Sequence, residues 1–201
     1  MIIGDLNKYR IILASRSPRR QDLLRELGLT FEVVVRDWLE EYPGDLRGEE
    51  IALYVALEKA KTFLPEIKDN EIVIAADTIV WCNNKVLDKP VDKKDALRII
   101  REISGNTHQV ITGVSLLSSI KQTSFCSSTK VTFSELSEEE IEYYIDKCSP
   151  YDKAGAYGIQ EWIGIAACSH IEGSYFNVMG LPAEQVYREL QKFIAPNHIA
   201  T

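Results

Sequence analysis

The sequence lacks the cysteine and histidine spacings on which several common kinds of site depend. Its four cysteines stand far apart with no CxxC pair, and its three histidines form no HExxH motif. Zinc centres and disulfide frameworks need such groups at characteristic spacings, so neither is expected. A Ser-His-Asp triad has equally little support. We expect the cysteines to be buried free thiols.

Long apolar runs and an excess of positive charge are also missing. No uncharged stretch approaches the roughly 18 residues of a membrane span, and the N-terminal residues carry no cationic segment followed by a long apolar one. We therefore expect no signal peptide, no membrane partner and a cytoplasmic location. The net charge of −7 argues against a nucleic-acid-binding surface, so an anion would have to bind at a local basic cluster.

Such a cluster stands in residues 13–20 (LASRSPRR), between an apolar run and a helical pattern of leucines. Ser17 is a good helix N-cap, and Pro18 suits the first helical position. Hydroxyls, helix N-terminal N–H groups and arginines together favour a polyphosphate. The segment is not a Walker A loop, because it lacks the glycines and the lysine. The alternative is a solvated basic helix end.

The remaining chain predicts an α/β fold with a mixed sheet. Apolar β-type runs alternate with helical patterns in the first half, and Asn83-Asn84 indicates a hairpin turn. Two long β-type segments, residues 110–117 and 123–133, should form an antiparallel pair. A capping box begins a helix at Ser137, and residues 163–171 read as a further strand. The length of 201 residues supports one domain with a sizeable core.

Acidic side chains follow two of the predicted strands. Asp77 comes directly after the apolar run 72–76, where crevices form in open α/β sheets, and it suits a metal ligand or a general base. A hydrogen-bonded turn aspartate explains it equally well. Glu40 and Glu41 could supply further oxygen ligands for Mg²⁺, although a solvated charge run is the simpler interpretation.

Three other polar residues could contact a ligand. Lys59 and Lys89 could bind phosphate, but lysines are most often exposed surface residues. Gln160 ends a glycine-containing loop and could read a base through its amide.

Together these signals resemble one family, the Maf nucleoside triphosphate pyrophosphatases, which are structurally akin to ITPase-like enzymes. The matching segments occur in family order along nearly the whole chain. They are residues 13–20, 58–60 (EKA), 76–80 (ADTIV), 88–90 (DKP), 104–110 (SGNTHQV), 152–160 (DKAGAYGIQ), 173–175 (GSY) and 178–182 (VMGLP).

The resemblance implies an elongated mixed β-sheet flanked by helices, in a single domain over residues 1–201 with two lobes and a cleft between them. It implies hydrolysis of a nucleoside triphosphate to the monophosphate and pyrophosphate with a divalent cation, Mg²⁺ or Mn²⁺. It also suggests a homodimer. Residues 152–160 are typical of the branch that prefers dTTP and UTP.

The resemblance also implies a role for each matching residue. Asp77 would be the catalytic acidic residue and, with Glu40, would hold the metal. Leu39 stands where many members carry aspartate, which puts a second acidic ligand in doubt. The residues that would bind the triphosphate are Arg20, Lys59 and Lys89, together with Ser15 and Ser17. The residues that would select the base are Arg19, Thr78 and Gln160.

Two alternatives to dTTP and UTP hydrolysis stay open. One is an enzyme of the same reaction that acts on 7-methyl-GTP or on modified nucleotides. The other is a nucleotide-binding regulator of septum formation. The joint presence of Asp77, Lys59 and Lys89 favours catalysis, since a mere binder could lose them.

Overall fold

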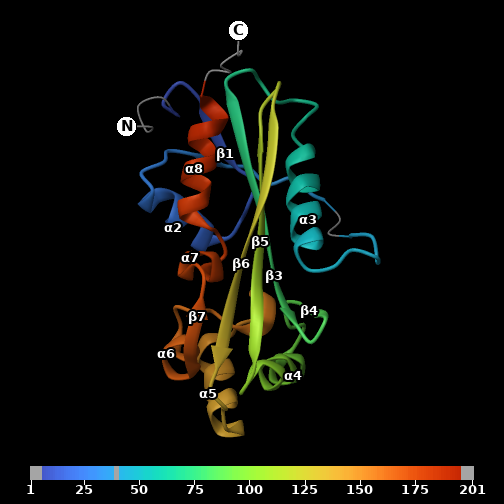
Figure 1. Cartoon of the computed structure of the whole chain (residues 1–201), viewed down its shortest axis with the longest axis vertical. Coiled ribbons are helices and arrows are strands. Elements are labelled where there is room, and N and C mark those ends of the chain that lie inside the picture. Colours follow the sequence, from blue (N-terminus) through green and yellow to red (C-terminus); the bar gives the residue numbers. More distant parts are fainter. Residues whose placement is uncertain (1–5, 39–40, 196–201) are drawn as a thin grey trace.

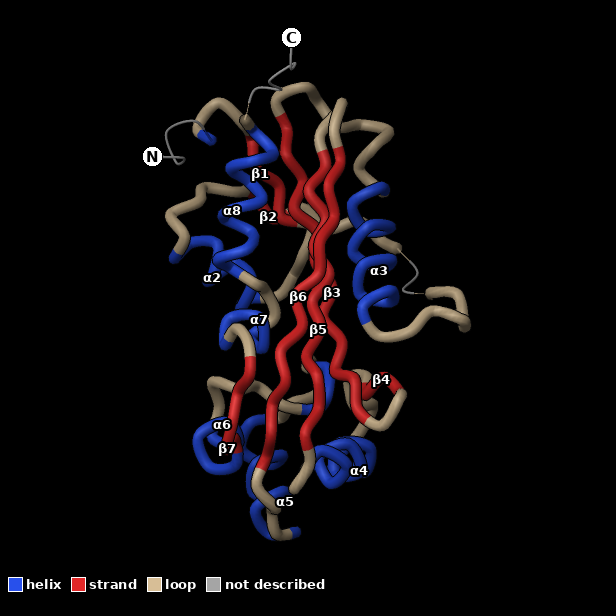
Figure 2. Tube along the Cα trace, in the orientation of Figure 1, coloured by secondary structure: helices blue, strands red, loops and turns tan. Residues whose placement is uncertain are grey.

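The computed structural model describes residues 6–38 and 41–195, and within them one mixed sheet of seven strands runs through the molecule (Figure 2). The strands are β1 (Arg10–Leu13), β2 (Glu32–Val33), β3 (Glu71–Cys82), β4 (Lys85–Leu87), β5 (Thr107–Leu117), β6 (Gln122–Phe133) and β7 (Cys168–Glu172). The helices are α2 (Pro18–Glu26), α3 (Glu49–Lys61), α4 (Lys93–Ile103), α5 (Glu138–Cys148), α6 (Trp162–Ala167), α7 (Tyr175–Met179) and α8 (Ala183–Ile194), with a short 3₁₀ turn, η1 (Ala154–Ala156).

The strand order is β2-β1-β3-β5-β6-β7, and β4 pairs with β3. β1 runs parallel to both β2 and β3, whereas the β3–β5, β5–β6 and β6–β7 pairs are antiparallel. The predicted mixed α/β sheet and the predicted antiparallel pair are therefore both confirmed. β3, β5 and β6 are long strands that run from the upper half of the molecule into the lower half (Figure 1).

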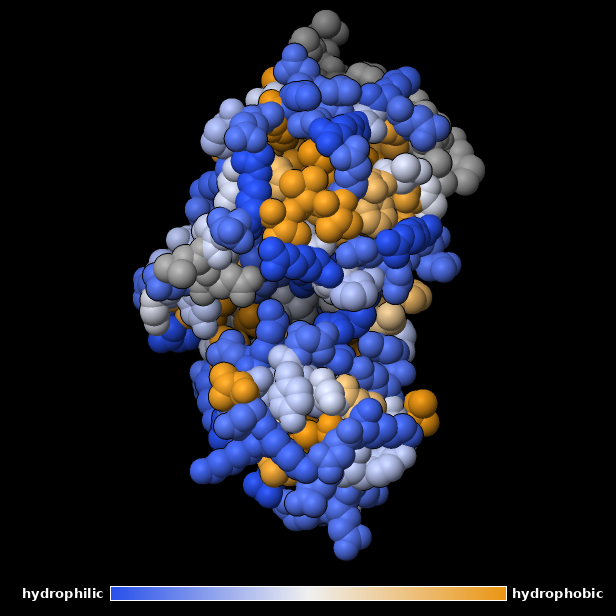
Figure 3. All heavy atoms as spheres, turned by 180° about the vertical axis from the view of Figure 1, so that it is seen from behind, coloured by the Kyte–Doolittle hydropathy of each residue, from blue (hydrophilic) through white to orange (hydrophobic). Residues whose placement is uncertain are grey.

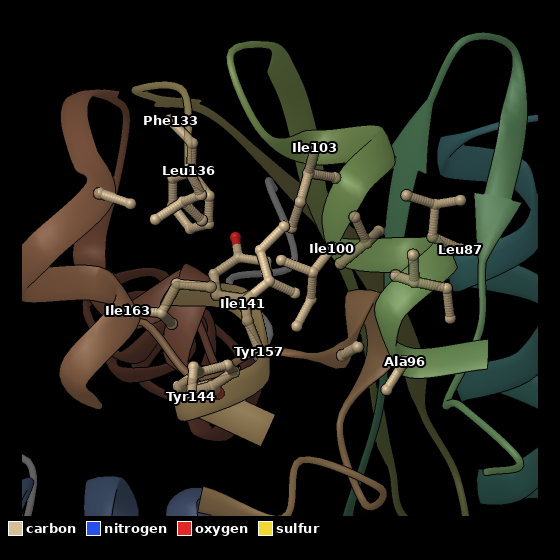
Figure 4. Close-up of a cluster of buried hydrophobic side chains, with 14 of the residues drawn as sticks. Leu87, Ala96, Ile100, Ile103, Phe133, Leu136, Ile141, Tyr144, Tyr157 and Ile163 are labelled. Carbon is tan, nitrogen blue, oxygen red and sulfur yellow. The ribbon is translucent and has the colours of Figure 1, made fainter. Parts of the chain in front are cut away.

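Helices cover the long strands at both ends. In Figure 1, α2, α7 and α8 lie on one side of the upper half and α3 lies on the other, while α4, α5 and α6 surround the lower end. A cluster of buried side chains from β1, α2 and α8 fills the upper side. A larger cluster, drawn in Figure 4, joins α4 and α5 to the strands at the lower end and includes Tyr144 and Tyr157. The sheet thus connects these two larger apolar cores, and two smaller clusters lie between α3 and the sheet.

Local chemistry explains several element boundaries. The Ser17 side chain caps α2 with Pro18 in the first turn, and Gly28 follows the helix end at φ 77°. Ser137 and Glu140 form the predicted capping box of α5. Asn83 and Asn84 both have positive φ, as a tight β-hairpin turn between β3 and β4 requires.

Three structural expectations from the sequence were wrong. Asp77 does not end a strand but lies in the middle of β3, because β5 pairs with β3 on both sides of it, from Val73 to Trp81. Residues 163–171 are not one strand: α6 takes the first part and β7 the rest. An apolar run cannot distinguish a short buried helix from a strand. The described cysteines are free, as expected, but only Cys82 among them is buried.

The surface seen from behind is largely hydrophilic, with an apolar area on the upper half (Figure 3). Below that area the surface is hollowed, between the upper and the lower half of the molecule. Among the described helices, none has the length and apolar character that crossing a membrane would require.

Candidate active site

A cleft of about 500 Å³ brings together the predicted site residues. Its wall is built from the segment after β1, from α3 and β3, and from the segments around η1 and α7. Every described residue that the resemblance assigns to the site lines it: Ser15, Ser17, Arg19, Arg20, Lys59, Asp77, Thr78, Lys89 and Gln160. Glu41, the other acidic candidate for Mg²⁺, does not line it. Glu40 lies outside the described residues.

Two of the residues that line this cleft, Lys59 and Asp77, form an ion pair. Lys59 Nζ, from the last turn of α3, lies 2.8 Å from Asp77 Oδ1, and the side chains are 18% and 17% exposed. A second hollow of about 230 Å³ also reaches Asp77, Thr78 and Lys89. Asp77 therefore presents a carboxylate, held by an ammonium group, between two open spaces.

Gly113 of β5 makes this pairing possible. It is the register partner of Asp77, and a Cβ built on it would lie 2.2 Å from the carbonyl oxygen of Ala52 in α3. The fully buried alanines Ala52, Ala56 and Ala60 let the helix lie directly on the sheet at this point. Because α3 packs closely on the sheet here, Lys59 lies within contact distance of Asp77. Sequence reasoning missed Gly113, although a glycine inside a strand often marks such an approach.

The segment before α2 is held by its own hydroxyls. Ser15 Oγ accepts a hydrogen bond from Ser17 N at 3.2 Å, and Ser17 Oγ accepts one from Arg20 N at 3.5 Å. Two backbone donors of the predicted anion site are thus already bonded within the loop. The serines shape the loop as well as line the cleft.

Arg20 ties three segments together. Its Nε donates to Gly180 O at 2.8 Å, its Nη1 to Ala76 O at 2.8 Å and to Ser15 Oγ at 3.3 Å, and its Nη2 to Thr78 Oγ1 at 2.8 Å. Thr78 Oγ1 also lies 2.9 Å from Thr112 Oγ1 of β5. The guanidinium therefore fixes the cleft wall on both sides of Asp77 and places positive charge there.

Two further cations differ in how they are held. Arg19 Nη1 lies 2.9 Å from Asp152 Oδ2, which joins α2 to the segment before η1. Lys89 is exposed, and its ammonium group makes no hydrogen bond or ion pair to any residue that the structure describes. Lys89 is therefore open to an anionic ligand.

Asp88 is an acidic group that sequence reasoning did not single out. It lines the second hollow beside Asp77, and its pKa is raised, first by partial shielding from solvent and then by the negative charge of Asp77. A bound cation would relieve this repulsion between carboxylates. Within residues 6–38 and 41–195, no three His, Cys, Asp or Glu side chains form a ready metal cage. Mg²⁺ commonly takes one or two carboxylates and completes its shell with substrate phosphates and water, which these residues fit.

A buried histidine supports the wall from inside. His108 is 1% exposed, and its Nε2 lies 2.7 Å from the hydroxyl of Tyr157, which lines the cleft. Its Nδ1 finds no hydrogen-bond partner among the described residues. Burial lowers the pKa of His108 to about 4, so the ring is neutral at pH 7.

We expect acid to destabilise the fold through His108. The unfolded chain takes up this proton near pH 6.5, whereas the folded chain resists until about pH 4. Stability is therefore lost as the pH falls between these values, by about 3 kcal/mol in total. Urea unfolding at several pH values would measure it. His108→Gln should flatten that part of the profile, and equal slopes in both proteins would contradict the assignment.

Comparison with known proteins adds an independent line of evidence. The family model described as "Maf-like protein" matches residues 10–193. A dTTP/UTP pyrophosphatase of Phocaeicola vulgatus is 52% identical over 192 residues, which cover 95% of this chain and 100% of the relative. A dTTP/UTP pyrophosphatase of Flavobacterium johnsoniae is 49% identical over 194 residues, with coverages of 96% and 100%.

Among solved structures, the chain is similar to a nucleoside-triphosphatase / dITP/XTP pyrophosphatase of Mycobacterium abscessus. The identity is 15% and the TM-score 0.43, with 90% of this chain and 93% of the other covered. The family match and the two close relatives together establish that the chain belongs to the Maf family.

Proposed function

We propose that the chain hydrolyses nucleoside triphosphates, above all dTTP and UTP, to the nucleoside monophosphate and pyrophosphate. The observation that carries the proposal is the Lys59–Asp77 pair in the wall of a cleft that further cationic side chains also line. The relatives named dTTP/UTP pyrophosphatase support the substrate class.

Asp77 acts as the base in this proposal. Water attacks phosphorus at the α–β bridge, its proton passes to the Asp77 carboxylate, and the bridging P–O bond breaks. Lys59 orients the carboxylate through its contact at 2.8 Å. Charge on the phosphates must be offset as the bond breaks, and Lys89 and Arg20 supply positive charge for this. Ser15 and Ser17 shape the loop that faces the triphosphate.

We assign base selection to the part of the cleft wall that carries Gln160. Gln160 is exposed there, and its amide forms no hydrogen bond with any described residue. An amide offers one donor and one acceptor side by side, which matches the N3–H and O4 edge of uracil and thymine. Arg19 and Thr78 flank the same cleft and complete the proposed selective group.

A divalent cation, Mg²⁺ or Mn²⁺, is part of the proposal. Asp77 and Glu40 would hold it, together with the substrate phosphates. When bound, it would neutralise phosphate charge and polarise the bond to be cleaved. The negative charge of Asp77 contributes to the raised pKa of Asp88. A cation bound at Asp77 would therefore also act on Asp88 and lower its pKa.

We further propose a single domain over residues 1–201, with one lobe around each apolar core and the cleft between them. The homodimer and the cytoplasmic location stay predictions. Light scattering of the purified chain would test the first, and fractionation of cells would test the second.

A nucleotide panel tests the proposed function. Pyrophosphate release should be fastest with dTTP and UTP in the presence of Mg²⁺ or Mn²⁺. Excess EDTA should lower it by at least about a hundredfold, because such ions contribute several kcal/mol to phosphate chemistry. Preference for 7-methyl-GTP would overturn the substrate assignment, and full activity in EDTA would overturn the metal assignment.

A further inference from the structure

The turn that carries Gln160 is confined from two sides. A Cβ on Gly158 would lie 2.8 Å from the Glu161 carboxyl carbon, and one on Gly164 would lie 1.8 Å from Ile159 O. Glu161 N also donates to Gly158 O at 3.0 Å. The backbone at residues 158–161 is therefore closely packed, whereas the Gln160 side chain is exposed to the cleft.

A buried polar network lies beneath this turn. Lys153, with a side chain only 9% exposed, places Nζ 3.0 Å from Glu161 Oε1. The other Glu161 oxygen accepts the hydroxyl of Tyr144, and that hydroxyl accepts the Gly158 N–H at 3.0 Å. Tyr144 is fully buried in the lower core (Figure 4). The network thus ends on the backbone of the turn itself.

The same network reaches across the cleft. Lys153 Nζ is 2.7 Å from Asp152 Oδ1, while Arg19 holds Asp152 Oδ2. Shielding from solvent raises the pKa of Asp152, but the hydrogen bonds from Lys153 and Arg19 outweigh it and leave the pKa below its ordinary value. Charged contacts therefore run from α2 to the core of the lower end.

We propose that Tyr144, Glu161 and Lys153 are positioning residues for base selection, which hold the turn so that the Gln160 side chain meets the base from one fixed position. This inference rests on the proposed function. A buried ion pair contributes little net stability to a fold. We therefore interpret the Lys153–Glu161 pair as a contact that fixes the geometry of the turn. A loosened turn would displace the Gln160 amide from the N3–H and O4 edge of uracil, so the preference for uracil over cytosine would fall.

Tyr144→Phe tests the proposal, because it removes one hydroxyl and leaves the ring in the core. The loss of the two hydrogen bonds that this hydroxyl makes to the turn, with Glu161 Oε2 and Gly158 N, should lower the UTP-to-CTP affinity ratio by about three- to tenfold. Calorimetry with the α,β-methylene analogues of both nucleotides measures this ratio without turnover. In kinetics, KM for UTP should rise while kcat changes by less than about twofold. Hydrogen exchange at residues 158–161 should become faster.

Tyr143→Phe is the matched control, since Tyr143 is the neighbouring residue on α5 but is exposed and bonds Lys147 instead. It should leave the ratio unchanged. Glu161→Gln keeps the shape and should also lower the ratio. An unchanged ratio in Tyr144→Phe, or equal loss of UTP and CTP binding, would overturn the proposal.

The proposed function and the positioning role of Tyr144 can be refuted separately. A wild-type chain that binds the UTP analogue selectively but releases no pyrophosphate would refute the proposed function and leave the positioning role standing. A chain that hydrolyses UTP but keeps its selectivity in Tyr144→Phe would do the reverse.

Discussion

Asp77→Asn should reduce kcat for UTP and dTTP by at least about a thousandfold, the upper range for loss of a positioned base. An amide cannot accept the proton from water, and it removes the negative charge proposed to hold the cation. The fold should persist, because asparagine has the same shape and Lys59 Nζ can still donate to its oxygen at the present 2.8 Å. Steady-state pyrophosphate release measures the effect.

Asp69→Asn is the matched control for this experiment. Asp69 is exposed just before β3 and does not line the cleft, so the same change in charge should leave turnover unaltered. Thermal unfolding of both variants separates loss of chemistry from loss of fold. If Asp77→Asn kept a tenth or so of the wild-type rate, Asp77 could not be the base, since that loss falls far short of general-base magnitudes.

Gly113→Ala should disrupt both the fold and the site. The added Cβ would lie 2.2 Å from Ala52 O, a backbone atom that can move only with α3. Forcing such a contact apart should cost at least about 2 kcal/mol of unfolding free energy. Because α3 carries Lys59, its displacement should also separate Lys59 Nζ from Asp77 and lower kcat. Urea unfolding and pyrophosphate release together measure the two effects.

Gly44→Ala provides the comparison. A Cβ at Gly44 has no heavy atom within 4 Å, so we expect a change within about 0.5 kcal/mol, as for ordinary surface substitutions. Equal stability in the two variants would show that α3 does not depend on contact with β5 at Gly113. If Gly113→Ala lost stability but kept its kcat, the contact between α3 and Gly113 would not be what positions Lys59 at Asp77.

Local sequence chemistry predicted the elements that depend only on neighbouring residues. The Ser17 cap, the Ser137–Glu140 capping box and the Asn83-Asn84 turn each involve atoms a few residues apart, and the structure confirms them. The sequence-based predictions were wrong where an element depends on a partner that is distant in the sequence. β3 passes through Asp77 without ending because β5, some thirty residues later, continues to pair with it.

The candidate site also combines features that the sequence predicts with features that depend on tertiary contacts. The resemblance supplied the residues that now line one cleft, but no pattern within the sequence could bring Lys59 to Asp77. That pair depends on the contact between α3 and Gly113, which is a tertiary feature. Lys153, Glu161 and Tyr144 were missed because a buried network has no characteristic spacing, and each residue alone resembles many others.

Product analysis of UTP hydrolysis shows which phosphoanhydride bond the chain cleaves and whether Asp77 is needed for the cleavage. With Mg²⁺ present, phosphorus NMR should show UTP converted to UMP and pyrophosphate by the wild-type chain, and no conversion above background by Asp77→Asn. Formation of UDP and phosphate would contradict cleavage at the α–β bridge. Conversion of UTP by the variant at the wild-type rate would contradict the role of Asp77.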